Sequence, residues 1–178
     1  ESLALMVHME DDLKREMGNI AAEQHEDVLD DLVDTVHRLT LWQDALPLFA
    51  CLSPNTQYKV INTPSMQKHE VLQATIFYTA QFNLWVTFLP LVEYMTEEQR
   101  KTLAQVIFEQ GIDLTRHITT VAYQHHLWQP LFDMLAAMSA EAQAQTAPVL
   151  KQLLAQEGGL ESKWQPLIAK HQLDHLFA

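Results

Sequence analysis

The stretch Leu41-Trp42-Gln43-Asp44-Ala45-Leu46 decides the fold, because its Leu-Trp pair returns at a fixed interval. Trp85 and Trp128 follow Trp42 at intervals of 43 residues, and a leucine precedes each tryptophan. Further apolar residues keep the same register, namely Leu48, Leu91 and Met134, and then Leu52, Met95 and Met138. Self-similarity at a period of this length is typical of repeat architectures. The sequence therefore predicts an α-α superhelix (a solenoid) of 43-residue helical repeats.

Composition agrees with an all-α class. The chain has 178 residues, of which 48% are apolar and 19% charged, as in a globular domain with a continuous core. Only four glycines occur, and the commonest residues are good helix formers. We expect a single domain over residues 1–178, with repeats at 27–69, 70–112 and 113–155. A partial repeat at 1–26 and a shortened C-terminal cap at 156–178, around Gly158-Gly159, complete it, and we expect the native protein to extend upstream of Glu1.

Each repeat is predicted to hold two or three helices. The first runs roughly over 26–38, 70–81 and 112–124 in successive repeats. A break follows, where Thr40 and Asn83 are suitable N-caps for the second helix and His126 is a weaker one. Proline removes a backbone donor and clashes with the previous turn. Pro47 and Pro90 are therefore expected to bend or split the second helix.

A third helix has the clearest start signals. Ser53-Pro54 combines an N-cap with proline at the first helical position, and Thr96-Glu97-Glu98-Gln99 has the form of a capping box. The helix is expected to end near Asn62-Thr63-Pro64 in one repeat and near Gly111 in the next. A single repeat of this kind cannot bury its apolar faces alone, so we expect neighbouring repeats to stack and complete the core.

This pattern resembles HEAT and armadillo repeats, whose unit length is similar. The segment from Phe88 to Arg100 is also similar to the helical repeats in the cytosolic N-terminal domain of MgtE-type magnesium transporters. In this segment and in the MgtE-type repeats alike, short apolar helices alternate with a capped, acidic helix start. The resemblance implies a fold and carries over no catalytic residue.

Two short motifs suggest chemistry. Asp30-Asp31-Leu32-Val33-Asp34 has the DDxxD form that holds magnesium and diphosphate in terpene and prenyl synthases, but no second metal motif accompanies it. His171 and His175 are four residues apart, a spacing that suits zinc or copper, yet no third ligand is evident nearby. A phosphate loop, a Cys-x-x-Cys pair and a nucleophile elbow are all missing from the sequence. We therefore expect no enzymatic activity, no metal site and no cofactor.

Charge narrows the choice of partners. The net charge of −12 opposes binding to the phosphates of nucleic acids and of anionic membranes, and it favours a basic partner. The sequence has no uninterrupted apolar run near the roughly 20 residues of a membrane span, so no direct membrane insertion is expected. The single cysteine, Cys51, suits a reducing compartment, and we expect a cytoplasmic protein.

Positions that differ between repeats commonly face a partner, whereas framework positions hold the stack. The variation is greatest along the first helix and at the break after it. We therefore predict a non-catalytic protein- or peptide-binding scaffold whose binding face includes His37, Tyr78, Gln81, Tyr123 and Gln124. Two alternatives remain open: a cytosolic regulatory domain that senses cations for a larger protein such as a transporter, and an enzyme that binds a metal or a small molecule.

Overall fold

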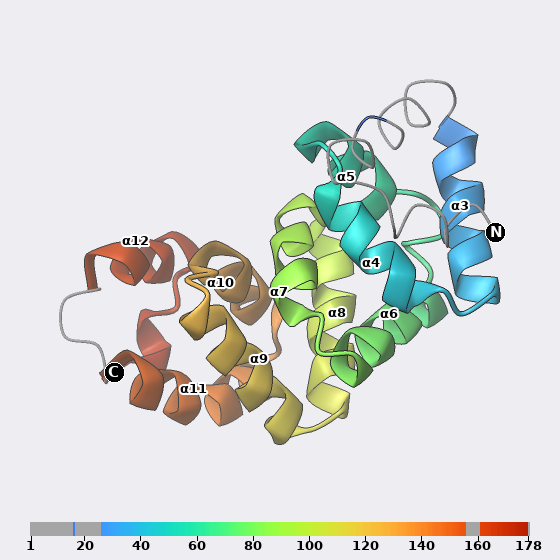
Figure 1. Ribbon diagram of the computed structural model, residues 1–178. Coiled ribbons are helices and arrows are strands. Elements are labelled where there is room, and N and C mark those ends of the chain that lie inside the picture. The colour runs from blue at the N-terminus through green and yellow to red at the C-terminus, as the bar shows by residue number, and fades with distance from the viewer. Residues whose placement is uncertain (1–15, 17–25, 156–160, 178) are drawn as a thin grey trace. The chain divides into compact units, whose positions relative to one another are not determined.

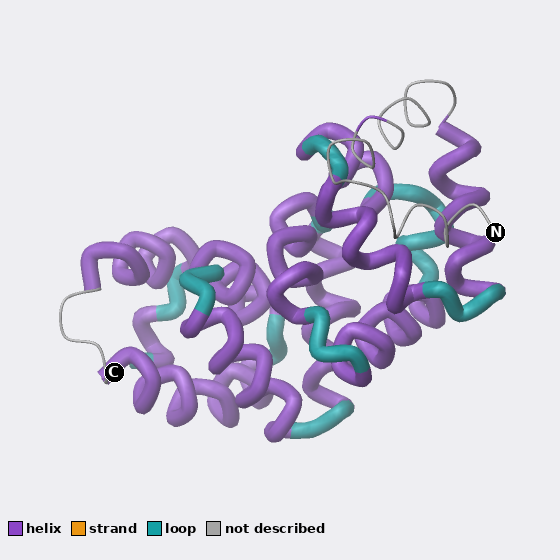
Figure 2. Tube along the Cα trace, viewed as in Figure 1, coloured by secondary structure: helices purple, strands orange, loops and turns teal. Residues whose placement is uncertain are grey.

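All regular structure that the computed structural model describes is helical (Figures 1 and 2). The description covers residues 16, 26–155 and 161–177. The predicted all-α class is thus confirmed for this part of the chain. Most of the predicted partial repeat 1–26, and Gly158-Gly159 in the predicted cap, lie outside the described residues. No described helix is long and apolar enough to cross a lipid bilayer.

The chain divides into two compact units, residues 1–96 and 97–178. The first unit contains α3 (Glu26–Arg38), α4 (Trp42–Cys51), α5 (Pro54–Ile61), α6 (His69–Gln81), α7 (Trp85–Phe88) and the 3-10 helix η1 (Leu89–Tyr94). The second contains α8 (Glu97–Glu109), α9 (Ile112–Gln124), α10 (Trp128–Ala137), α11 (Ala140–Ala155), α12 (Glu161–His171) and the 3-10 helix η2 (Asp174–Leu176). The helices predicted at 26–38, 70–81 and 112–124 are confirmed as α3, α6 and α9, and only α6 begins one residue early.

The break after each of these helices is a left-handed turn. Thr40, Asn83 and His126 have φ values of 55°, 52° and 57°. Around Thr40, the N–H of Leu41 donates to the carbonyl of Val36 at 2.9 Å, and the N–H of Thr40 donates to the backbone carbonyl of His37 at 3.2 Å. These two bonds define a Schellman motif. The same pair of bonds surrounds the turns that follow α6, α9 and α12.

The prediction that Thr40, Asn83 and His126 cap the second helix is wrong. The N-cap positions belong to Leu41, Leu84 and Leu127, which make no side-chain capping hydrogen bond. The physical reason is that a left-handed residue belongs to the C-terminal end of the preceding helix, where backbone bonds satisfy the last carbonyls. Each second helix then begins at the tryptophan itself, and these tryptophans are at most 6% exposed.

Other local predictions have mixed outcomes. Ser53 caps α5 as predicted, since its Oγ accepts the N–H of Thr56 at 3.3 Å and Pro54 is the first helical residue. Pro90 splits its helix as predicted: the α-helix α7 ends at Phe88, and the chain goes on as the 3-10 helix η1 from Leu89. Pro47 does not split α4, which runs through it from Trp42 to Cys51.

Each unit has its own apolar core. In the first, α4 packs on α6 and α7 around Trp42 and Trp85, and α5 packs on α3 and η1. In the second, α10 packs on α8 and α12 around Phe132, and α11 packs on α9. Among the described residues, the indole Nε1 atoms of Trp42, Trp85 and Trp128 are buried without a hydrogen-bond partner. Burial of the ring therefore outweighs the cost of an unmatched donor at these positions.

Candidate functional site

Two of the predicted partner-binding residues lie at the C-terminal end of α6. Tyr78 stacks on Phe82, with ring centroids 6.2 Å apart and planes within 9° of parallel. Phe77 sets its ring edge-on to Tyr78 at 5.2 Å and is 57% exposed. We call Phe77, Tyr78 and Phe82 the aromatic cluster. Gln81 is exposed on the last turn of the same helix, so the structure brings Tyr78 and Gln81 to one end of α6.

Phe77 and Phe82 were not among the predicted binding residues. The spacing from Tyr78 to Phe82 is four residues, and residues four apart on a helix lie on the same face. That spacing was the available signal for Phe82. Phe77 also has a signal in the sequence, because it stands 43 residues after Asp34 and 43 before Thr120, at a position that differs in each predicted repeat.

His37 has a different environment. Its ring lies edge-on to Trp42, with centroids 6.4 Å apart, and the side chain is half-buried. Its Nδ1 is buried and lacks a hydrogen-bond partner among the described residues. The structure therefore places His37 in the packing beside the first tryptophan.

In the second unit, Tyr123 and Gln124 lie at the C-terminal end of α9. Tyr123 is half-buried and sets its ring edge-on to Trp128, with centroids 5.7 Å apart. His126, in the left-handed turn, also lies near this indole, at 6.3 Å. Gln124 is exposed. Tyr123 thus supports the tryptophan, while Gln124 is open to solvent.

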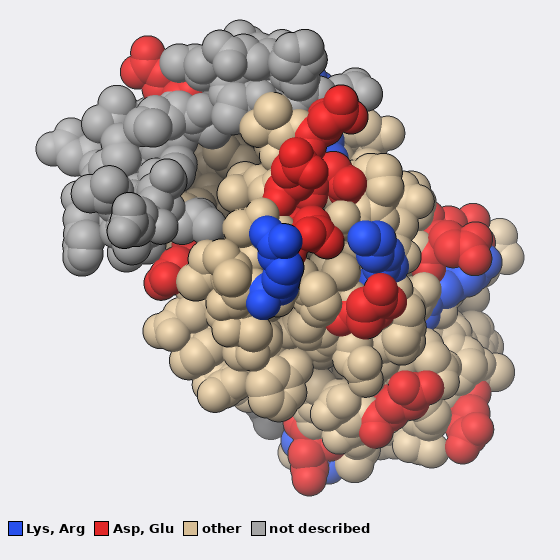
Figure 3. Space-filling model, turned by 90° about the vertical axis from the view of Figure 1, so that its right-hand side faces the viewer, with Lys and Arg blue, Asp and Glu red and all other residues tan. Residues whose placement is uncertain are grey.

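The DDxxD stretch serves the first unit structurally. Oδ1 of Asp30 accepts the backbone N–H of Ser65 at 2.7 Å, and Asp34 pairs with Lys68 at 3.9 Å. Both contacts tie α3 to the segment that leads into α6. Asp27 and Asp31 are exposed, and the face viewed from the side of α3 carries a run of acidic side chains (Figure 3).

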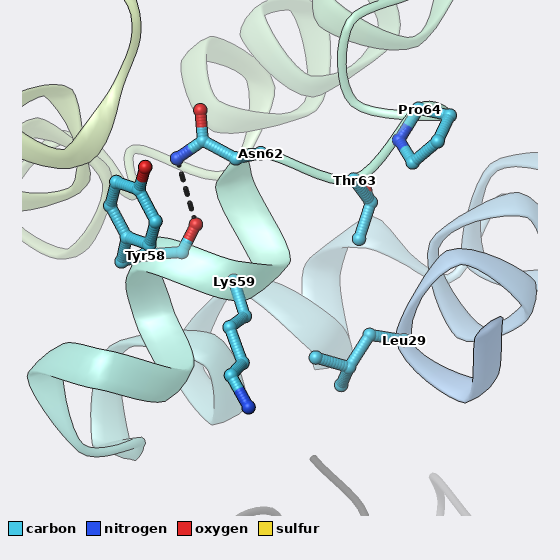
Figure 4. A pocket seen from close by; sticks show the side chains of 6 residues that line it. All are labelled: Leu29, Tyr58, Lys59, Asn62, Thr63 and Pro64. Carbon is cyan, nitrogen blue, oxygen red and sulfur yellow. Dashed lines mark hydrogen bonds between the residues drawn. The ribbon is translucent and has the colours of Figure 1, made fainter. Parts of the chain in front are cut away.

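A hollow of about 190 Å³ opens in the first unit (Figure 4). Its walls come from α3, α5 and the loop after α5, and consist of Leu29, Tyr58, Lys59, Asn62, Thr63 and Pro64. Nδ2 of Asn62 donates to the carbonyls of Tyr58 and Tyr94, both at 2.8 Å. The amide is therefore engaged in joining α5 to η1, and Thr63 likewise donates to the carbonyl of Val60.

The second unit buries a carboxylate that sequence reasoning did not single out. Asp133, on α10, is 7% exposed. Its Oδ1 accepts from Nε2 of Gln129 at 2.8 Å and lies 3.0 Å from Nε2 of His171 on α12. The His171 contact has the distance of an ion pair without the alignment of a hydrogen bond. Nη1 of Arg100, on α8, lies 3.8 Å from the other oxygen, Oδ2.

Burial lowers the pKa of His171, while the nearby carboxylate of Asp133 partly opposes that shift and Lys170 and Arg100 add to it. The imidazole is therefore mainly neutral at pH 7. A signal for Asp133 does exist in the sequence: it follows Pro90 by 43 residues, as Pro90 follows Pro47, so it breaks the pattern of proline at this spacing.

His171 and His175, whose spacing was noted in the sequence, face different neighbours. Nε2 of His175 lies 3.1 Å from Oε1 of Gln143 on α11, whereas His171 faces Asp133. Within the described ranges, no three His, Cys, Asp or Glu side chains gather closely enough to hold a metal ion. The two histidines connect α12 and the segment after it to different neighbours.

No protein-family model matches this chain. The search of curated proteins and the search of solved structures also returned no match. The Asp133 site brings together acidic and basic side chains from α8, α10 and α12.

Proposed function

We propose that this protein is a non-catalytic helical-repeat scaffold that binds a protein or peptide partner through the aromatic cluster. The recurrence of one local arrangement supports the repeat. Three left-handed turns stand 43 residues apart, and each is followed two residues later by a buried tryptophan that starts a helix. In repeat proteins, recurring arrangements of this kind stack into a solenoid. We place the scaffold in the cytoplasm, in keeping with its single cysteine.

The aromatic cluster, in which Phe77 is exposed and Tyr78 and Phe82 are half-buried, carries the binding part of the proposal. Exposure of a ring as large as Phe77, at 57%, leaves apolar area in water. Burying an aromatic ring at an interface gives much of the energy of a binding hot spot. Tyr78 and Phe82 hold each other in a stack, so little side-chain entropy is lost when a partner covers them.

The negative charge of this protein favours a positively charged partner. Asp27 and Asp31 are exposed in the same unit as the aromatic cluster, and the chain as a whole has a net charge of −12. Electrostatic complementarity raises the rate at which a partner of opposite charge associates. The proposed partner is a basic segment with at least one large apolar or aromatic anchor residue.

A displayed library of random peptides tests this proposal with a defined probe. We expect selection to enrich peptides that carry a net positive charge and an aromatic or leucine anchor. The affinity of a synthetic copy of an enriched peptide should fall by roughly tenfold or more in Phe77→Ala, because hot-spot truncation has effects of this size. The matched control is Tyr58→Ala, which removes an aromatic ring that is 55% exposed in the same unit but lies on α5.

Two results would overturn the proposal. One is a folded protein that enriches no peptide sequence. The other is an enriched peptide whose affinity is lowered equally by Tyr58→Ala and by Phe77→Ala, or by neither. Circular dichroism of each variant establishes that it is folded, which the exposure of both rings leads us to expect.

A further inference from the structure

A second hollow, independent of the aromatic cluster, lies in the second unit beside Asp133. It has a volume of about 220 Å³ and is lined by residues of α8, α10 and α12: Glu97, Arg100, Lys101, Asp133, Ala136, Ala137 and His171. Pockets for drug-sized molecules begin at about 300 Å³. Only a small ligand fits this hollow.

The polar groups around this hollow are incompletely matched. The 3.8 Å between Arg100 and Oδ2 of Asp133 is too long for a hydrogen bond. Oδ1 is already used by Gln129. A guanidinium with spare donors thus lies beside a buried carboxylate oxygen with spare acceptor capacity. A buried ion pair is favourable only when its remaining donors and acceptors find partners.

The walls carry equal numbers of both charges. Arg100 faces Asp133, and Lys101 pairs with Glu97 at 2.6 Å. The Lys101–Glu97 pair is exposed, with side chains 62% and 76% accessible, so it is weak and free to rearrange. An anion alone would meet the repelling carboxylates of Glu97 and Asp133, and a cation alone would meet Arg100 and Lys101. A ligand with a positive and a negative end meets an opposite charge at each end.

We propose that this hollow binds a small zwitterion of the size of a free amino acid. Its carboxylate pairs with Arg100, where two parallel hydrogen bonds can form. Its ammonium donates to Oδ2 of Asp133. The methyl groups of Ala136 and Ala137 leave space for the ligand's own side chain. His171, mainly neutral at pH 7, adds no third charge to the walls.

Calorimetric titration and protein-observed NMR, with each of the common free L-amino acids as the probe, test this proposal. We expect at least one to bind, and we expect its N-acetyl and its methyl-ester derivatives each to bind roughly tenfold more weakly or worse. Each derivative removes one of the two charges, so a zwitterion site must reject both. A site for a simple carboxylate would instead accept the N-acetyl form, and a site for an amine would accept the ester.

Variants connect the binding to this hollow. Arg100→Gln should abolish it, while Arg116→Gln, which removes an exposed arginine of α9, should leave it unchanged. Ala136→Leu fills the hollow from an exposed position, so it should abolish binding in a protein of unchanged thermal stability. The proposal is overturned if no free amino acid binds to the folded protein. It also fails if a capped derivative binds as well as the free form, or if Ala136→Leu keeps full affinity.

Discussion

Replacement of Thr40 by glycine should stabilise the protein. Thr40 has a φ of 55°, where a side chain with a Cβ costs about 1–2 kcal/mol. Glycine removes this cost but adds about 0.5–1 kcal/mol of backbone entropy to the unfolded chain. The hydrogen bond that Thr40 Oγ1 donates to the carbonyl of Leu39 at 2.7 Å is exposed, so its loss matters little. The difference leaves a net gain of about 0–1.5 kcal/mol, or an increase of up to roughly 12 °C in Tm for a unit of this size.

Thr40→Ala is the matched control for this change. It removes the same hydroxyl and keeps the Cβ from which the strain arises, so its Tm should equal that of the parent or fall slightly. Thermal unfolding followed by far-UV circular dichroism measures both variants. If Thr40→Ala raised the Tm as much as Thr40→Gly, or if Thr40→Gly lowered it, the strain argument would be refuted.

Four further predictions follow from the contacts described above. Ser53→Ala removes the cap of α5, and Ser139→Ala removes the cap of α11, where Ser139 Oγ accepts the N–H of Ala142 at 3.2 Å; each should lower the free energy of unfolding by about 1 kcal/mol in urea titrations. Asn62→Ala should cost about 1–3 kcal/mol in the same assay, because it leaves the Tyr94 carbonyl without its donor. Burial lowers the pKa of His171, so its contribution to stability is complete above its ordinary pKa and is lost as the pH falls toward the lowered value. His171→Gln should therefore flatten the loss of Tm on mild acidification, and an unchanged pH profile would contradict this. Asp30 and Asp34 are already engaged, so millimolar Mg²⁺ should leave the Tm unchanged, and a rise would favour the cation-sensing alternative.

Helix positions could be predicted from the sequence because apolar periodicity and strong caps are local signals. Ser53-Pro54 marks a helix start through its own side chain and ring, and the structure agrees. The left-handed turns could not be predicted in this way. Glycine is the usual residue at that position, but here threonine, asparagine and histidine take it, and each of them also fits the description of an N-cap or a weak one.

The candidate site was harder to predict than the fold. Comparison of the predicted repeats selects Tyr78 and Gln81, which lie at one end of α6, and equally His37 and Tyr123, which pack against tryptophans, so sequence variation alone does not separate these environments. Asp133 was missed because it stands in an apolar helix where the other repeats have proline. Its neighbours, Arg100 and His171, come from helices far away in the sequence, so only the tertiary structure brings these side chains together.

The indole N–H groups of Trp42, Trp85 and Trp128, which are buried without a hydrogen-bond partner in the described part of the chain, can report local opening of the protein. A buried N–H exchanges its hydrogen with solvent only when the structure around it opens locally. Trp42 and Trp85 lie in the first unit and Trp128 in the second. The hydrogen-exchange rates of their indole N–H groups therefore measure local opening separately in the two units. Equal exchange rates would mean that both units open as one cooperative block. A slower exchange rate at one tryptophan would identify the unit that opens less often.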